Sequence, residues 1–243
     1  LIIYKDELIF TSVYDDMGMI IFWNLLTGEY KRNISAHSNS IRALLVNKND
    51  ELISGSDDST IKIWNMTTGD YRITLSGHVS EIMSLIINKN DELISGSADR
   101  TIRIWNMTTG QIKKILSEHS SNVNSLIINK NHELLSGSSD RLIKVWDMTN
   151  ESFKKNLAGH NGLVITLIVN KKNELISGSA DNTIKIWNTT TGECIRTLVG
   201  HSGQVNSLVI NEHDELISGS SDKTIKVWNM TTGECKRNLT GHT

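Results

Sequence analysis

The six tryptophans of this 243-residue chain are spaced evenly, 41 residues apart, at Trp23, Trp64, Trp105, Trp146, Trp187 and Trp228. Six of the eight histidines keep the same spacing. Self-similarity at one fixed period along a whole chain is the sequence signature of a repeat architecture. We therefore interpret residues 1–243 as a single domain built from six copies of one unit.

One unit contains four short segments with the composition of β-strands. The predicted strands are residues 82–88, 92–97, 101–107 and 111–116, and turns of three residues separate them. The first strand is almost wholly apolar, the third alternates and the fourth is more polar, which places the fourth outermost. The turns are rich in Asn, Asp, Thr and Gly, since the chain has no proline. The pattern predicts an antiparallel four-stranded meander.

A meander of this size cannot bury enough apolar surface to fold alone, so successive units must pack on one another. A four-stranded sheet that recurs about every 40–45 residues is a propeller blade. The prediction is an all-β propeller with six four-stranded antiparallel blades. A leucine-rich solenoid is excluded because it has one strand per 20–29 residues or so.

Two units depart from the pattern. The segment 7–23 is three residues longer than 51–64, and Met17 stands where other units carry an aspartate such as Asp58. The first strand of that unit is reduced to residues 1–3. In the fourth unit, residues 149–152 replace the glycine turn. Terminal repeats are often atypical.

Composition excludes several classes of function. The formal net charge of −2 argues against a nucleic-acid surface, which usually carries a basic excess. No apolar stretch approaches the roughly 18 residues of a transmembrane helix, so we expect no membrane association. Arginine and lysines on the third strands are expected to be solvated; they are Lys62, Arg103, Lys144, Lys185 and Lys226.

The two cysteines, Cys194 and Cys235, occupy equivalent repeat positions. Other units fill this position with Tyr30, Tyr71, Ile112 and Phe153, which predicts a semi-buried apolar slot. Equivalent positions in neighbouring units lie too far apart for a disulfide, so we expect free thiols in a reducing compartment. The expected location is cytoplasmic or nuclear.

Gly-His pairs stand at a fixed distance before the aspartate and tryptophan of a repeat. They are Gly77-His78, Gly159-His160 and Gly200-His201, and a further pair, Gly241-His242, closes the series. On these residues the chain resembles the WD40-repeat β-propeller family from end to end. The Trp-Asp signature occurs only as Trp146-Asp147, and Ala36-His37 and Glu118-His119 lack the glycine. Most members have seven blades, so we expect this chain to be part of a longer one, with closure of six blades as the alternative.

The resemblance implies a buried His-Ser-Asp-Trp hydrogen-bonded tetrad in each regular repeat. The sets are His37, Ser54, Asp58, Trp64; His78, Ser95, Asp99, Trp105; His119, Ser136, Asp140, Trp146; His160, Ser177, Asp181, Trp187; and His201, Ser218, Asp222, Trp228. An indole N–H needs an acceptor when buried, and a hydroxyl can link it to a histidine. A catalytic triad would occur once, whereas this set occurs five times, so we interpret it as structural and expect no catalytic residue.

No metal or cofactor site is expected. His132 and His213 lie in predicted turns of alternate units and lack convergent ligands. The Ser-Gly-Ser segment of each second strand is interpreted as packing against the ring centre rather than as a phosphate-binding loop. Asn-Met-Thr segments fit the glycosylation sequon but arise from the Trp-Asn variant of the signature.

The resemblance further implies that a partner protein binds on the narrow face of the propeller. That face is built by the loop before each first strand and by the turn after each second strand. The corresponding residues here are Ser40, Arg42, Asp57, Glu81, Met83, Ala98, Asn122, Asn124, Ser139, Leu163, Ile165, Ala180, Gln204, Asn206 and Ser221. They differ between units whose framework is constant, which is typical of a specific binding surface.

The expected function is therefore a non-catalytic protein–protein interaction scaffold that binds an extended peptide or loop. The alternative is a substrate-recognition or sensor module of a larger protein that carries an F-box, a kinase or a nucleotide-binding domain. Other proteins are the expected partners.

Overall fold

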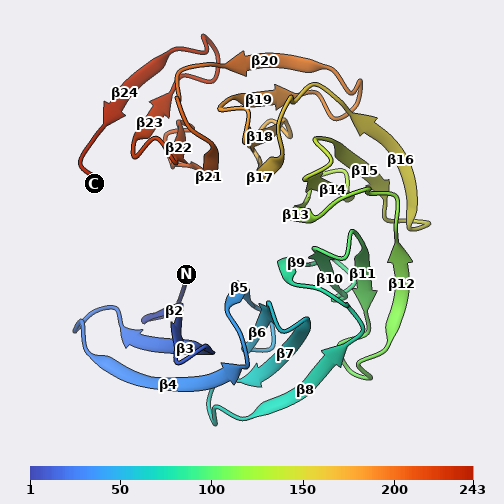
Figure 1. Cartoon of the computed structure of the whole chain (residues 1–243), viewed down its shortest axis with the longest axis vertical. Helices are drawn as coiled ribbons and strands as arrows, with labels where there is room; N and C mark the ends of the chain where they lie inside the picture. Colours follow the sequence, from blue (N-terminus) through green and yellow to red (C-terminus); the bar gives the residue numbers. More distant parts are fainter. Residues whose placement is uncertain (243) are drawn as a thin grey trace. The chain divides into compact units, whose positions relative to one another are not determined.

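The computed structural model describes residues 1–242, and these residues form strands and no helix. No helix suited to crossing a membrane therefore occurs in this part of the chain. Close contacts divide the chain into two compact units, residues 1–117 and residues 118–243. Each unit contains three four-stranded antiparallel sheets in chain order (Figure 1).

In the first unit, the strands follow one another as antiparallel neighbours in each sheet. The first sheet is β1 (Ile2–Tyr4), β2 (Glu7–Tyr14), β3 (Met17–Asn24) and β4 (Tyr30–His37). The second is β5 (Ile41–Val46), β6 (Glu51–Ser56), β7 (Thr60–Asn65) and β8 (Tyr71–Ser76). The third is β9 (Ile82–Ile87), β10 (Leu93–Ser97), β11 (Ile102–Trp105) and β12 (Ile112–Leu116).

The second unit repeats this topology. Its first sheet is β13 (Val123–Ile128), β14 (Glu133–Ser138), β15 (Ile143–Asp147) and β16 (Ser152–Leu157). Then come β17 (Val164–Val169), β18 (Leu175–Ser179), β19 (Ile184–Trp187) and β20 (Cys194–Leu198). The last sheet is β21 (Val205–Ile210), β22 (Leu216–Ser220), β23 (Ile225–Trp228) and β24 (Cys235–Leu239). The predicted six meanders are thus confirmed, with strands one or two residues shorter at some ends.

The turns explain why these short strands form. Asn47 accepts the backbone N–H groups of Asn49 and Glu51 through its side-chain oxygen, and Asp50 takes a φ of 59°. Asn and Asp tolerate this left-handed conformation and bond their own backbone, so they reverse the chain without proline. In the fourth unit Glu151 adopts a φ of 53° where the other units have glycine, which accounts for the replaced turn.

The hydrophobic core lies between successive sheets of a unit rather than within one sheet. Ile53, Ile61 and Leu75 of the second sheet pack with Ile82 and Trp105 of the third, and all are buried. The second unit repeats this arrangement with Val145, Leu157, Val164 and Trp187. Each sheet therefore needs its neighbour to exclude water, as the size of the unit predicted.

Glycine lets neighbouring sheets approach. A Cβ atom on Gly178 would lie 2.8 Å from Val205 Cγ1, and one on Gly55 would lie 2.5 Å from Ile82 Cγ2. The glycines of these Ser-Gly-Ser segments thus pack on the first strand of the next sheet.

Two expectations about exposure were wrong. Cys194 and Cys235 are free but exposed, because the fourth strand lies at a sheet edge with no strand over it. Lys144 and Lys226 are 6% and 9% exposed instead of solvated. Their third strand lies between two others, and their ammonium groups bond the Asn156 and Asn238 side chains at 2.8 and 2.9 Å.

The first sheet lacks the regular hairpin. Its β2 and β3 each have eight residues and pair as far as Tyr14 and Met17, with Asp15 and Asp16 at positive φ between them. Trp23 is 37% exposed, whereas the other five tryptophans are buried.

Candidate functional site

The structure brings together all five predicted His-Ser-Asp-Trp sets. In the second sheet, His37 Nε2 lies 2.7 Å from Ser54 Oγ, its Nδ1 lies 2.8 Å from Asp58, and Trp64 donates its indole N–H to Ser54 at 2.8 Å. The other four sets repeat these contacts within 0.1 Å, around Ser95, Ser136, Ser177 and Ser218.

The histidine of each set comes from the segment that leaves the preceding sheet. His37 ends β4, while its partners lie on β6, β7 and the turn between them. The set therefore links two successive sheets, which repeat spacing alone does not reveal.

Burial favours one proton arrangement in three of these sets. Burial lowers the pKa of His37, His78 and His160 despite the neighbouring aspartates, which favours neutral rings. A neutral ring donates Nδ1–H to the aspartate and accepts the serine O–H at Nε2. The serine oxygen then accepts the indole N–H.

The aspartates are held ionised. Burial alone would raise the pKa of Asp140, but hydrogen bonds from His119 and from the backbone N–H groups of Ser120 and Leu142 hold it at about 2. Asp181 has a pKa of about 2 for similar reasons. Every serine of the five sets is fully buried, so its hydroxyl is closed to a substrate as well as occupied by the tryptophan.

The predicted partner-binding positions lie close together within each sheet. In the first unit the Asp57 N–H donates to the Ser40 carbonyl, and the Ala98 N–H to the Glu81 carbonyl, both at 2.9 Å. Arg42 makes two bonds to the Asp57 carboxylate, at 2.5 and 2.8 Å, and this carboxylate raises the pKa of the guanidinium. Met83 lies on β9, two residues after Glu81, and is half-buried.

The second unit repeats the backbone frame with different side chains. The N–H groups of Ser139, Ala180 and Ser221 donate at 2.9 Å to the carbonyls of Asn122, Leu163 and Gln204. Leu163 is 42% exposed and Ile165 is half-buried, which gives this surface an apolar part. Asn206 donates to the Ser221 hydroxyl at 2.8 Å.

Asn124 differs from the other surface positions. Its side-chain amide donates to the Ser139 hydroxyl at 3.1 Å and to the Val164 carbonyl of the next sheet at 2.8 Å. Its amide is thus committed to holding two sheets together, and less of it is available to a partner.

A family model described as "WD domain, G-beta repeat" matches five segments, residues 28–65, 69–106, 110–147, 151–188 and 192–229. These segments cover well over half of the chain. The chain belongs to the WD40 family. The family match and the six four-stranded sheets confirm the predicted fold class, a WD40-type β-propeller. Comparison with curated proteins gives no significant match.

Each WD40 segment joins the last strand of one sheet to the first three strands of the next. The segment 28–65 contains β4 to β7, so the sequence repeat is offset from the sheet by one strand. This offset places the histidine and its three partners in the same repeat. WD40 repeats generally serve as protein–protein interaction scaffolds, and the family is generally non-catalytic.

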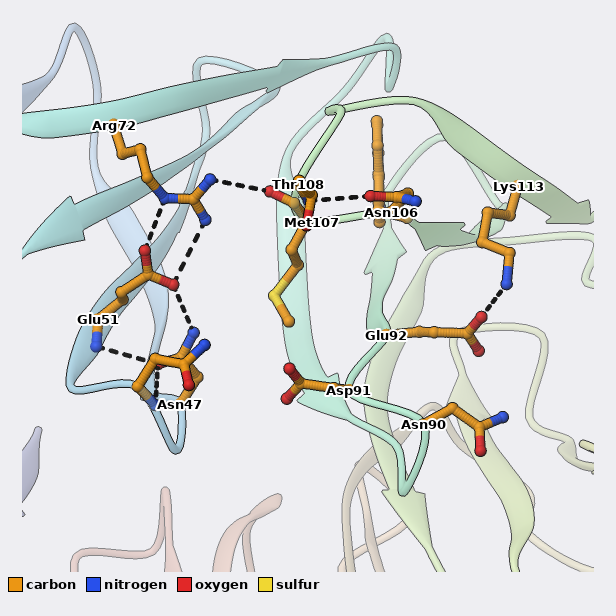
Figure 2. A pocket seen from close by; sticks show the side chains of 12 residues that line it. Asn47, Glu51, Arg72, Asn90, Asp91, Glu92, Asn106, Met107, Thr108 and Lys113 are labelled. Carbon is orange, nitrogen blue, oxygen red and sulfur yellow. Dashed lines mark hydrogen bonds and ion pairs between the residues drawn. The ribbon is translucent and has the colours of Figure 1, made fainter.

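Sequence reasoning missed a second set of polar contacts, at the opposite ends of the WD40 strands. Asn47 donates to the Glu51 carboxylate at 2.7 Å, and Arg72 on β8 pairs with the same carboxylate at 2.6 Å. Figure 2 shows these side chains in a cavity of about 280 Å³ within the first unit. A glutamate followed by a cation 21 residues later, in several repeats, was the available signal.

His132 and His213 are exposed turn residues, and residues 1–242 contain no group of three potential metal ligands.

Proposed function

We propose that this WD40 chain is a non-catalytic scaffold that binds an extended peptide or loop of a partner protein. The binding face consists of the loops before the first strands and the turns after the second strands. The observation that carries the proposal is a backbone hydrogen bond that recurs at 2.9 Å in five sheets. It runs from the Asp57 N–H to the Ser40 carbonyl and joins the four equivalent pairs in the same way. A constant frame carries side chains that differ from sheet to sheet.

The side chains on this frame suit recognition of a peptide that carries both polar and apolar side chains. In the first unit, Arg42 is exposed and is held by Asp57, with Glu81 also contributing to its electrostatic environment. Arginine is enriched among residues that dominate binding energies, and a pre-oriented side chain loses less entropy on binding. In the second unit, exposed Leu163 offers an apolar contact, and Asn206 and Ser221 offer amide and hydroxyl groups.

The polar sets beneath this face support a scaffold rather than an enzyme. Serine, histidine and aspartate meet five times, but each serine is buried and accepts a tryptophan N–H, as Ser95 does from Trp105 at 2.8 Å. A nucleophile must reach its substrate and keep its base for proton transfer. In these sets the serine hydroxyl and the histidine ring are instead both engaged in internal hydrogen bonds.

Selection from a displayed library of random peptides tests the proposal. Peptides that bind the wild-type chain should bind the Arg42→Ala or Leu163→Ala variant at least about tenfold more weakly, as expected for a hot-spot residue. Matched controls are Lys89→Ala and Leu26→Ala, because both side chains are exposed in turns at the other ends of the strands.

The control variants should bind the selected peptides like the wild type. Equal binding of every selected peptide by the wild type and by both face variants would contradict the proposal. Thermal melts of all five proteins establish that lost binding is not lost folding.

A further inference from the structure

The glutamate that opens a second strand has a cationic partner on the fourth strand in most sheets. Glu51 pairs with Arg72, Glu133 with Lys154 and Glu215 with Lys236, at 2.6, 2.5 and 2.9 Å, and Glu92 pairs with Lys113 in the same way. The sheet formed by β17 to β20 is the exception. Its glutamate is Glu174, and the residue 21 positions later is Ile195.

Glu174 is held in place without a cation. Its carboxylate accepts the Asn170 amide at 2.6 Å, as Glu51 accepts Asn47, but within residues 1–242 it forms no ion pair. Ile195 is 50% exposed, so half of the side chain at the cation's position is open to solvent.

A cavity lies at this place in the second unit and corresponds residue by residue to the cavity in Figure 2. Glu174, Ile195, Asp214 and Met230 stand where the first unit has Glu51, Arg72, Asp91 and Met107. The volume rises from about 280 Å³ to about 410 Å³. The larger cavity is consistent with the loss of a guanidinium side chain from this wall.

The first unit shows how a guanidinium fits such a cavity. Arg72 donates from Nε to Glu51 at 2.6 Å and from Nη2 to the same carboxylate at 3.3 Å. Its Nη1 donates to the Met107 carbonyl at 3.2 Å (Figure 2). The planar fork of arginine matches a carboxylate and a carbonyl at once, which a lysine ammonium cannot do with the same geometry.

We propose that the cavity beside Ile195 binds an arginine side chain supplied by a partner protein. The guanidinium bonds the Glu174 carboxylate and the Met230 carbonyl in the manner of Arg72, and Ile195 packs on its aliphatic stem. The site lies at the ends of the strands opposite to the peptide-binding face proposed above. A negative result at one of the two sites therefore does not bear on the other.

The other cationic side chains of the cavity do not pair with Glu174. Lys236 pairs with Glu215 at 2.9 Å, and Arg196 donates to the Thr232 carbonyl at 3.0 Å. Lys172 replaces Asn49 but makes no ion pair with Glu174. Asp214 adds a second carboxylate to the cavity wall. Its Oδ1 is buried without a hydrogen-bond partner among the described residues, whereas Asp91 pairs with Lys48.

Methyl NMR of the chain labelled at methionine tests the site, since Met230 and Met107 report on the two equivalent cavities. The probe is N-acetylarginine amide, and its citrulline analogue is the uncharged control of the same shape. We expect the arginine probe to shift the Met230 methyl signal saturably and to leave Met107 unchanged. The citrulline analogue should bind at least about tenfold more weakly, because it lacks the charge that Glu174 recognises.

Three variants decide the outcome. Ile195→Arg fills the cavity from within and should abolish the Met230 shift, and Glu174→Gln should weaken binding at least about tenfold. Arg72→Ile opens the first cavity and should make Met107 respond as well. The proposal is overturned if Met230 does not respond to the arginine probe, if citrulline binds equally, or if folded Ile195→Arg binds like the wild type.

Discussion

The His37 ring on β4 lies 2.7 Å from the Ser54 hydroxyl on β6, so a hydrogen bond joins the last strand of one sheet to the second strand of the next. The same contact recurs at four further places, and Ser54 also accepts the Trp64 indole N–H. Within a unit, a polar set thus acts at a junction between sheets, where the hydrophobic core also lies. A substitution in one set should therefore weaken the packing of two neighbouring sheets.

Replacing Asp140 with asparagine should lower the free energy of unfolding by about 1–3 kcal/mol. Asp140 accepts His119 and the Ser120 N–H at one oxygen and the Leu142 N–H at the other. An amide has one acceptor oxygen, so its NH₂ group would face a donor. Urea unfolding measures the loss, and Asp70→Asn in an exposed turn is the control.

Peptide binding on the proposed face should survive Asp140→Asn nearly intact. An unchanged melt together with lost binding would contradict the structural role of the set.

Stability should fall as the solution becomes acidic, in two stages. The folded chain holds His37, His78 and His160 below the ordinary pKa of 6.5, so below pH 6.5 the unfolded chain takes up protons that the folded chain resists. Each unit of pKa difference corresponds to about 1.4 kcal/mol. The second stage comes from Asp140 and Asp181, whose pKa is 3.8 in the unfolded chain and about 2 in the folded chain. Their contribution to stability is lost as the pH drops from 3.8 to about 2.

Urea titrations at a series of pH values from 8 to 2 measure this dependence. His213→Gln is the control variant, because His213 is exposed in a turn. A free energy of unfolding that stays constant between pH 7 and pH 5 would show that the neutral-ring arrangement is wrong.

Adding a methyl group at Gly178 should destabilise the second unit by about 1–3 kcal/mol through overpacking. The new Cβ would lie 2.8 Å from Val205 Cγ1 and 2.9 Å from Thr166 Cγ2. Val205→Ala removes the nearer clash, so Gly178→Ala should cost less in that background. A double-mutant cycle from urea unfolding measures the coupling, and strictly additive costs would show that the two sheets do not meet here.

Asn124 and Asn206 hold the same repeat position but should respond differently to alanine. Asn124→Ala removes a bond to the Val164 carbonyl of the next sheet and should cost about 1–2 kcal/mol of stability. Asn206 is exposed, and among the described residues its side chain bonds only the Ser221 hydroxyl, so Asn206→Ala should cost less than about 0.5 kcal/mol. Thermal melts compare the pair, and equal melting temperatures would contradict the assignment.

Contacts that follow from spacing were predictable. His78, Ser95, Asp99 and Trp105 keep one mutual spacing in five repeats, and a repeated backbone brings repeated residues to equivalent places. The pairing of Ser40 with Asp57 on the proposed binding face also follows from the strand register.

Contacts that depend on a neighbouring strand or sheet were not predictable. Cys194 and Lys144 were assigned the wrong exposure, because alternation along a strand does not tell whether another strand covers it. Asn124 and Asn206 look alike in the sequence, but Asn124 bonds the Val164 carbonyl of the next sheet, whereas Asn206 lies in the last sheet of its unit.

The sequence by itself determined the repeat, the four strands of each unit, the family resemblance and the residues of the polar sets. All of these rest on local chain geometry, which a fixed 41-residue period reproduces. The tertiary structure decided that polar sets join successive sheets within a unit, that Lys144 and Lys226 are buried, and that Ile195 leaves a cavity where Arg72 fills one. These features arise from side chains of different sheets meeting in space, and the spacing along one chain does not specify those distances.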